Sequence, residues 1–585
     1  MAKKDTILQD LVRGYQAAKS AYKPIQERRE KNFELYTGRS PKKKYKARAS
    51  FHVPYVATLL ENVWPLLTSR MPESSINARN HERDSDAADL MEELVKYTFD
   101  VNDFDWLFTM TVKDAMLFDA GWFKVCWLYQ DEKTDHPLIE SIDPGSMLVH
   151  PQKVKLDDRW PIYHRQEMTK GQMKEMGWDA RQINSLGESK LNNDDYRKQR
   201  MEKLGLKTDG TDGDLYEVVY VECKMDLSFG EDDAAKEEVA HFVIANEEKI
   251  LNTKPFTGRK KYQSPYDHQW YSYVWLPYSP IPHSMLSESF IDPVVSQQEE
   301  LNALENMKAD NYKLRNNPPL KVRRDANIDL RTLRFETGLP WLVEEMTDIQ
   351  MEVIPDLATS IENQQNMIKH QMQNRTGAND VLLVSGDVGV QGGDSATGAA
   401  IADQNTKIRF RSQAQMIDWA VKRVGDMIVA LYQQPTLFDR EKAISIADEE
   451  GNYYEQTVRP DEVKGDLQFV VGSASTIAES NDAKLAKYMN LRETYVEDPS
   501  VNIDEIDKKI FEAADLEYSK VKKDKDTRMS DLATKLQELV AITKRPEFAN
   551  TPAREQAAVM TQIRQMRDIL SGGQGAGQPD PNAAI

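Results

Sequence analysis

Residues 292–311 read DPVVSQQEELNALENMKADN, and residues 317–319 read NPP. Leu301, Leu304 and Met307 recur three residues apart, which places them on one face of a helix. The helical pattern spans 287–315, and the two prolines that follow it predict its end. Pro293 lies in its early part, so the sequence leaves open whether the helix kinks or begins there.

The chain on the C-terminal side of this helix alternates between short strand patterns and long helical patterns. Gly338 and Pro340 mark turns in a β-like segment at 320–343. Further along we expect a helix at 356–375, a glycine-rich loop at 376–393, a long helix at 397–432, strands within 442–472, helices over 480–570 and a disordered end at 571–585.

The N-terminal side begins with helices and then changes to strands. Apolar spacing predicts helices at 5–36 and 51–70 and two more within 83–118. Aromatic and β-branched residues then predict strands at 122–129, 138–142, 163–167, 215–223, 239–244 and 271–276. The predicted fold class is therefore α+β.

Composition excludes several classes of protein. The 585 residues (67.1 kDa) are 40% hydrophobic and 29% charged, which argues against wholesale disorder and fibrous architectures. The net charge is 76 − 95 = −19, which argues against a nonspecific nucleic-acid coat. Residues 1–50 are basic, with fourteen Lys and Arg against five Asp and Glu, and the run 42–48 is either a solvated loop or a surface that faces phosphate or a partner.

Cysteine content suggests a reducing compartment, and hydropathy suggests a soluble protein. Cys126 and Cys223 are the two cysteines, too few and too distant for a disulfide framework. The N-terminus lacks the apolar core of a signal peptide, and no stretch of 18 apolar residues occurs. We expect a soluble protein that stays, or is assembled, inside a cell.

Motifs for catalysis were sought and not found. The nine histidines form no HExxH or HxxxH pattern. The glycine-rich segment 386–398 lacks the Gly-Lys-Ser/Thr of a phosphate-binding loop and misses the GxSxG pattern of a serine nucleophile. Asp394, Ser395 or Thr397 is instead expected to cap the helix that follows.

The segment 376–406 contains no Lys or Arg but does contain Asp380, Asp387, Asp394 and Asp403. An acidic, glycine-rich loop binds polyanions poorly. It is therefore either an ordinary surface loop or a surface past which DNA slides without sticking.

Three stretches together resemble the portal proteins of tailed bacteriophages. The first is 292–311 with the NPP that follows it, and the second is TGANDVLL at 376–383 with SATGAAI at 395–401. The third is 48–65, which includes FHVPY at 51–55 and ENVWP at 61–65. The order of helix, short β insert, helix, glycine-rich loop and long helix is also similar.

This resemblance implies a portal fold with wing, stem, clip and crown. The expected divisions are N-terminal helices and α+β wing at 1–283, first stem helix at 284–316, clip at 317–355, second stem helix at 356–376, tunnel loop with long wing helix and wing strands at 377–476, helical crown at 477–571 and disordered tail at 572–585. A clip of that size cannot bury a core alone and would pair across subunits.

The family further implies a ring, expected to be a dodecamer, that forms a DNA channel at one vertex of the virion after assembly in the host cytoplasm. Its implied partners are the terminase large subunit, a head-tail adaptor, the major capsid and scaffold proteins and the double-stranded DNA that passes through it, with no membrane. The implied roles are genome packaging, genome retention, tail attachment and DNA ejection. No enzymatic activity, cofactor or metal is expected.

The resemblance also assigns roles to residues. Asp380, Asp387 and Asp394 are expected in the tunnel loop at the channel. The stem residues Leu301, Leu304 and Met307 are expected to pack between subunits. The cations expected to dock a partner at the clip are Lys321, Arg323, Arg324, Arg331 and Arg334.

Two other functions stay open at the level of sequence. One is a head-tail adaptor or another structural protein of the virion, which would not form a closed ring. The other is a metal-dependent nuclease, which would need clustered carboxylates to hold Mg²⁺.

Overall fold

The computed structural model of the 585-residue chain describes most of the first 472 residues. The chain divides into two compact units, 1–478 and 479–585, and the elements below belong to the first. The described residues are 2–38, 48–69, 71–72, 74–127, 136–189, 215–227, 237–256, 258–326, 328, 343, 345, 347–378, 396–447, 453–472, 488–489, 492, 506 and 509–510.

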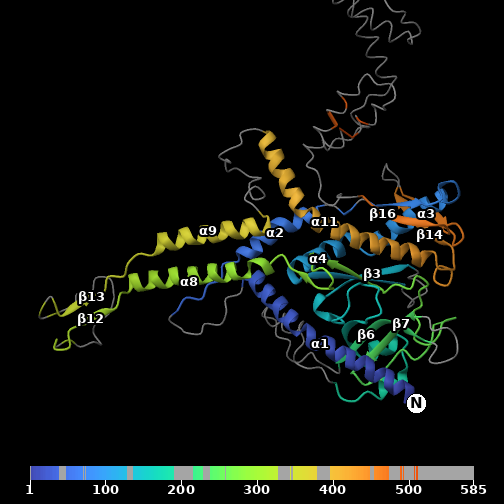
Figure 1. Cartoon of the computed structure of the whole chain (residues 1–585), viewed down its shortest axis with the longest axis horizontal. Helices are drawn as coiled ribbons and strands as arrows, with labels where there is room; N and C mark the ends of the chain where they lie inside the picture. The colour runs from blue at the N-terminus through green and yellow to red at the C-terminus, as the bar shows by residue number, and fades with distance from the viewer. Residues whose placement is uncertain are drawn as a thin grey trace, which may run out of the picture. The chain divides into compact units, whose positions relative to one another are not determined.

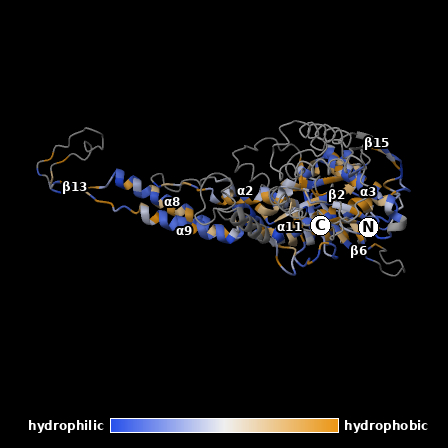
Figure 2. Cartoon of the chain, turned by 90° about the horizontal axis from the view of Figure 1, so that it is seen from above, coloured by the Kyte–Doolittle hydropathy of each residue, from blue (hydrophilic) through white to orange (hydrophobic). Residues whose placement is uncertain are grey.

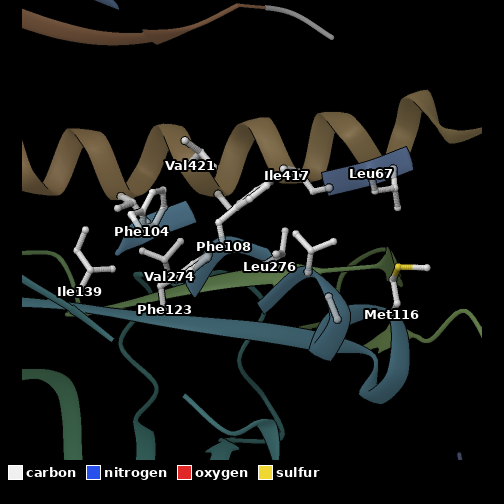
Figure 3. Close-up of a cluster of buried hydrophobic side chains, with 14 of the residues drawn as sticks. Leu67, Phe104, Phe108, Met116, Phe123, Ile139, Val274, Leu276, Ile417 and Val421 are labelled. Atoms are coloured by element: carbon white, nitrogen blue, oxygen red, sulfur yellow. The ribbon is translucent and has the colours of Figure 1, made fainter. Parts of the chain in front are cut away.

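A three-stranded antiparallel sheet lies at the centre of the largest core. Its strands are β2 (Ala120–Trp127), β3 (Pro137–Ile142) and β9 (Tyr273–Pro277), in the order β3-β2-β9. Helices α4 (Phe104–Phe118) and α11 (Ala396–Tyr432) pack on this sheet. Figure 3 shows apolar side chains from both helices and from the strands filling the space between them, among them Phe104, Phe108, Phe123, Val274, Leu276, Ile417 and Val421.

A second antiparallel sheet has five strands and its own core. Its order is β4 (Met147–Val149), β5 (Ile162–Thr169), β6 (Leu215–Asp226), β7 (Glu237–Ala245) and β8 (Lys249–Ile250). The first helix, α1 (Ala2–Thr37), contributes Tyr15, Ala18 and Tyr22 to this core. The apolar spacing of the first helix thus serves the second sheet.

Two strand pairs and several short elements complete the first unit. β1 (Ser74–Ala78) pairs with β16 (Leu467–Val471), and β14 (Lys442–Ala447) pairs with β15 (Tyr453–Val458). The remaining elements of this part are α2 (Tyr55–Thr68), α3 (His81–Val101), the 3-10 turn η1 (Pro144–Ser146), α5 (Lys170–Glu175), α6 (Ala180–Asn184), β10 (Ser279–Pro280) and β11 (Ser287–Glu288).

Helices α8 (Val295–Asn316) and α9 (Ala358–Thr376) run side by side, and a two-stranded ribbon lies between them in sequence (Figure 1). The ribbon pairs β12 (Leu320–Val322) with β13 (Ile349–Met351) at the end of the helices farther from α4. Figure 2 shows hydrophilic and hydrophobic residues mixed along both helices. We call α8, α9 and this ribbon the helical arm.

The predicted α+β class is confirmed, and so are the helices and strands predicted from spacing within the described residues. The helical pattern extended back to residue 287, but α8 begins at Val295, which agrees with the alternative that the helix begins near Pro293. Residues 292–294 form the 3-10 turn η2, in which the Ser289 hydroxyl accepts hydrogen bonds from the N–H groups of Ile291 and Asp292. Pro293 therefore marks the start of the helix and not a kink within it. The helices expected over 480–570 fall largely, and the tail at 571–585 wholly, outside the described residues.

Candidate functional site

The two helices of the arm contact each other through a narrow apolar seam. Leu301 and Leu304 of α8 are 1% and 7% exposed, and they belong to the same core as Ile361 and Ile368 of α9. Polar contacts flank the seam, including Lys308 Nζ to Glu362 Oε1 (2.7 Å), Gln364 Nε2 to Glu300 Oε1 (3.0 Å) and Gln365 Nε2 to Glu305 Oε2 (2.9 Å). Much of the contact between α8 and α9 is therefore hydrophilic.

The residues predicted to pack between subunits divide into two kinds. Leu301 and Leu304 are buried within the single chain, because the core around α9 covers them. Met307 is 57% exposed. Of the three, Met307 is the side chain that the arm presents to its surroundings.

The helical arm exposes several other large apolar side chains. Val353, which follows β13, is 88% exposed, and Met367 of α9 is 56% exposed. The remaining members of this group are Tyr312, Leu314, Met351 and Leu357. These side chains are distributed over α8, β13, the residues that follow β13 and α9, and such exposed apolar surface is available for association.

The cations predicted to dock a partner lie partly in ion pairs on the ribbon. Lys321 pairs with Glu352, and Arg323 bridges Glu345 (2.7 Å) and Asp348 (3.1 Å). Arg324 is exposed, whereas Arg331 and Arg334 lie outside the described residues. The exposed pairs Lys321–Glu352 and Arg323–Glu345 contribute only about 0–1 kcal/mol each, whereas the Asp348 side chain that also holds Arg323 is 2% exposed.

The three aspartates predicted for the tunnel loop, Asp380, Asp387 and Asp394, lie outside the described residues. The structure does describe both ends of this segment. Helix α9 ends at Gly377, whose left-handed φ of 81° and N–H bond to Gln373 O (2.9 Å) form a C-terminal cap. Helix α11 begins at Ala396, so the acidic segment joins the arm to the longest helix of the first unit.

A buried ionic cluster fixes α1 and the start of the arm to the central sheet. Arg29 Nη2 donates to Asp119 Oδ1 (2.7 Å), and both side chains are 4% exposed. Arg28 Nη2 donates to Asp119 Oδ2 (2.8 Å), and Asn32 Nδ2 donates to Asp292 Oδ1 just before α8 (2.8 Å). Sequence reasoning missed this cluster, because residues distant in sequence carry no local sign that they will meet.

The described part of the chain contains no grouping of three or more His, Cys, Asp or Glu side chains that could hold a metal ion. A cavity of about 610 Å³ is lined by Glu92, Lys96 and Asp105, but Glu92 accepts the Ile76 N–H (3.1 Å) and pairs with Lys96 (3.0 Å). Burial raises the pKa of the Cys223 thiol to about 12, so this thiol stays protonated at neutral pH.

Among the helices that the structure describes, none combines the length and the apolar character needed to cross a bilayer.

Comparison with known proteins gives a family. The sequence model of the family described as "Phage SU10 portal protein" matches residues 129–567, more than half of the 585 residues. The matched region contains the arm, the acidic segment and α11, but not residues 48–65. A search of curated proteins found no match. On the strength of the family match, this chain belongs to the phage SU10 portal protein family.

Proposed function

We propose that the chain assembles into a ring around a DNA channel at one vertex of a phage capsid. In this role it takes part in genome packaging with the terminase motor, in genome retention, in tail attachment and in DNA ejection, and has no catalytic activity of its own. The family match supports this proposal, since a phage portal is a structural, capsid-associated oligomer. The partners proposed are the terminase large subunit, a head-tail adaptor, the major capsid and scaffold proteins and double-stranded DNA.

The observation that carries the proposal is the apolar surface of the helical arm. Val353, Met307 and Met367 are each more than half exposed in the single chain. Each large apolar side chain contributes about 1.5–3 kcal/mol when it is fully removed from water. A second copy of the chain supplies this burial if one side of an arm packs against the other side of its neighbour. Such a head-to-tail contact forms a ring when its rotation closes.

The elements then take roles within the subunit. We assign α8 and α9 to the stem, the ribbon and its connections (317–355) to the clip, and 377–476 to the tunnel loop, long wing helix and wing strands. Residues 1–283 form the remainder of the wing, and 477–571 the crown. Met307 contacts the neighbouring stem, while Leu301 and Leu304 support it from within the subunit.

Charge supports the passage of DNA through the channel. A ring of twelve chains carries 12 × −19 = −228 charges, which disfavours adhesion of DNA. We propose that Asp380, Asp387 and Asp394 lie at the constriction, and that Lys321, Arg323 and Arg324, with Arg331 and Arg334, dock an adaptor or the terminase. Asp→Lys changes that leave packaging rate and genome retention untouched would refute the first assignment.

Particle mass and shape test the function as a whole. We expect light scattering after size exclusion to give about 12 × 67.1 = 805 kDa, with rings and a central hole in negative-stain images of the same peak. A monomer that remains a monomer after mixing with scaffold protein would favour the head-tail adaptor alternative.

A further inference from the structure

One face of α8 carries polar side chains four residues apart that bind the backbone of another segment. These residues, the polar strip, are Gln298, Asn302, Asn306 and Asp310. The bound segment, the strap, comprises residues 48–54 between α1 and α2 together with Tyr55 and Val56, the first two residues of α2. The bonds run from Ala49 N–H to Asp310 Oδ1 (2.6 Å), Phe51 N–H to Asn306 Oδ1 (2.5 Å), Val53 N–H to Asn302 Oδ1 (2.9 Å) and Val56 N–H to Gln298 Oε1 (3.0 Å).

The strip also donates to the carbonyl groups of the strap. Asn306 Nδ2 donates to Phe51 O (3.1 Å), and Gln298 Nε2 donates to Val53 O (2.6 Å). Asn306 therefore binds both backbone groups of residue 51, much as a neighbouring strand does in a sheet. The helix side chains of the polar strip thus bind the strap's backbone in the way that the edge strand of a β-sheet binds a neighbouring strand.

The repeat distances explain why these two segments fit. Side chains four apart on a helix lie on one stripe and rise about 6 Å per step. Alternate residues of an extended chain rise about 6.7 Å and point to the same side. Residues 49, 51 and 53 can therefore meet successive members of the strip without a break in register.

Most polar contacts between the strip and the strap go to the strap's backbone, and one goes to a side chain, from Asn302 Nδ2 to His52 Nδ1 (3.2 Å). The Phe51 residue is 54% exposed although its N–H and C=O groups are both bonded. Amide side chains, which have both a donor and an acceptor, suit this task, since every residue except proline offers the same pair of groups. The chemical class of ligand is thus an extended polypeptide whose backbone supplies most of the bonds, with a side-chain contact at position 52 and an exposed side chain at position 51.

The strap also bears on how α8 is held. The bonds reach from Gln298, close to the start of α8, to Asp310, in its second half. Burial raises the pKa of the Asp310 carboxyl, but the Ala49 N–H and Lys313 outweigh this effect and lower it. Beyond Leu304, the large apolar side chains of α8 are exposed, and polar contacts support that half. The strap provides some of them, and others come from Lys308 Nζ to Glu362 Oε1 (2.7 Å) and from Asn311 Nδ2 to Pro355 O (3.2 Å).

We propose that the polar strip is a docking site for extended backbone, and that the strap bound in it is a latch that holds the second half of α8 against the body. This proposal does not depend on ring assembly. It makes the strap a part of the chain whose release would free the helical arm.

Hydrogen exchange of the full-length chain at single-residue resolution tests both parts. Phe51→Pro removes one N–H, whereas its matched control Phe51→Ala keeps it. We expect Phe51→Pro to speed exchange about three- to tenfold at 49–56 and also at 305–316, and Phe51→Ala to change both by less than twofold. Equal effects of the two variants would overturn backbone recognition. Unchanged exchange at 305–316 in Phe51→Pro would overturn the latch.

A substitution in the polar strip tests the same contact without a proline in the strap, so it remains informative if the proline variant misfolds. Asn306→Ala removes both bonds to residue 51 and leaves the strap sequence intact. Its control is Asn316→Ala, which removes an exposed amide at the end of the same helix. We expect the Phe51 amide to exchange faster than in the wild type in Asn306→Ala, and at the wild-type rate in Asn316→Ala. Equal exchange rates at Phe51 in the two variants would contradict the proposal.

Discussion

The central sheet and the helical arm bury their apolar residues in different ways. Around β2, aromatic side chains from strand and helix pack against each other within the chain, as in Phe104 and Phe123, whose tilted rings have centroids 5.6 Å apart. The arm has a thin apolar seam flanked by ion pairs and amide contacts, and it leaves Met307 and Val353 exposed. The central sheet therefore buries its apolar side chains within one copy of the chain. The arm keeps exposed apolar side chains, which we propose are covered by another copy.

This difference separates residues that fold the subunit from residues that join subunits. Changes at the sheet should lower the free energy of unfolding of each chain. Changes on the outside of the arm should leave that free energy nearly unchanged and alter assembly instead. The predictions below run from the largest expected loss of stability to the smallest.

Phe123→Ala should destabilise the subunit most. Phe123 is fully buried in β2 at the centre of the core in Figure 3. Truncation of a buried aromatic ring costs about 3–5 kcal/mol, because it removes buried surface and leaves a cavity. Urea denaturation followed by circular dichroism measures this loss. Val353→Ala, at an 88% exposed site of the arm, is the matched control and should change stability by less than about 0.5 kcal/mol.

Asp119→Asn should cost about 3 kcal/mol. It removes the negative charge that pairs with the buried Arg29 guanidinium, and breaking a buried pair is far more costly than breaking an exposed one. Asn tolerates the left-handed backbone at this position, where φ is 97°. The exposed pair Arg13–Asp10 provides the control, since Asp10→Asn should cost under about 1 kcal/mol. Similar losses for both variants would refute the role given to the cluster.

Acidification should weaken the five-stranded sheet through His164. Burial lowers the pKa of His164 to about 3, against about 6.5 in the unfolded chain. Between these values the unfolded state binds more protons, so stability falls as the pH falls. From pH 7 to pH 5 the wild type should lose about 2 kcal/mol more than His164→Gln. Denaturant midpoints at both pH values measure the difference, and parallel losses in the two proteins would contradict it.

Met307→Ser combined with Val353→Ser should separate folding from assembly. Both residues are exposed, so the free energy of unfolding should change by less than about 0.5 kcal/mol. Light scattering should nevertheless show that the oligomer is lost or weakened. Met176→Ser, at an exposed apolar site outside the arm, should leave both stability and mass unchanged. Loss of folding in the double variant would erase the distinction between the two regions.

The sequence predicts local structure well where a single periodicity governs it. Alternating aromatic and β-branched residues located β2 and β9, and helical spacing located α8, α9 and α11. For the start of α8 the sequence left two alternatives at Pro293, and the structure decides between them, because the Ser289 hydroxyl binds the N–H groups of Ile291 and Asp292 ahead of the helix. The pairing of β1 with β16 depends on residues almost 400 positions apart, which no local pattern encodes.

The proposed site was predictable only in part, for the same reason. A stripe of Leu301, Leu304 and Met307 indicates one helical face, but the return of α9 decides which of the three is covered. The polar strip on α8 has a visible four-residue repeat of amides and a carboxylate. The repeat alone does not predict what these side chains bind. The structure shows it, because the strap, some 250 residues earlier in the sequence, lies beside the strip.

The central claim is that the outside of the helical arm contacts a neighbouring copy of the chain. Photo-crosslinking tests it most directly, with p-benzoylphenylalanine placed at Met307 and, as control, at Met176. The account predicts a ladder of covalent multimers of the 67.1 kDa chain after irradiation when the probe replaces Met307, and none when it replaces Met176. Particles that assemble normally but give only monomeric products from position 307 would contradict it.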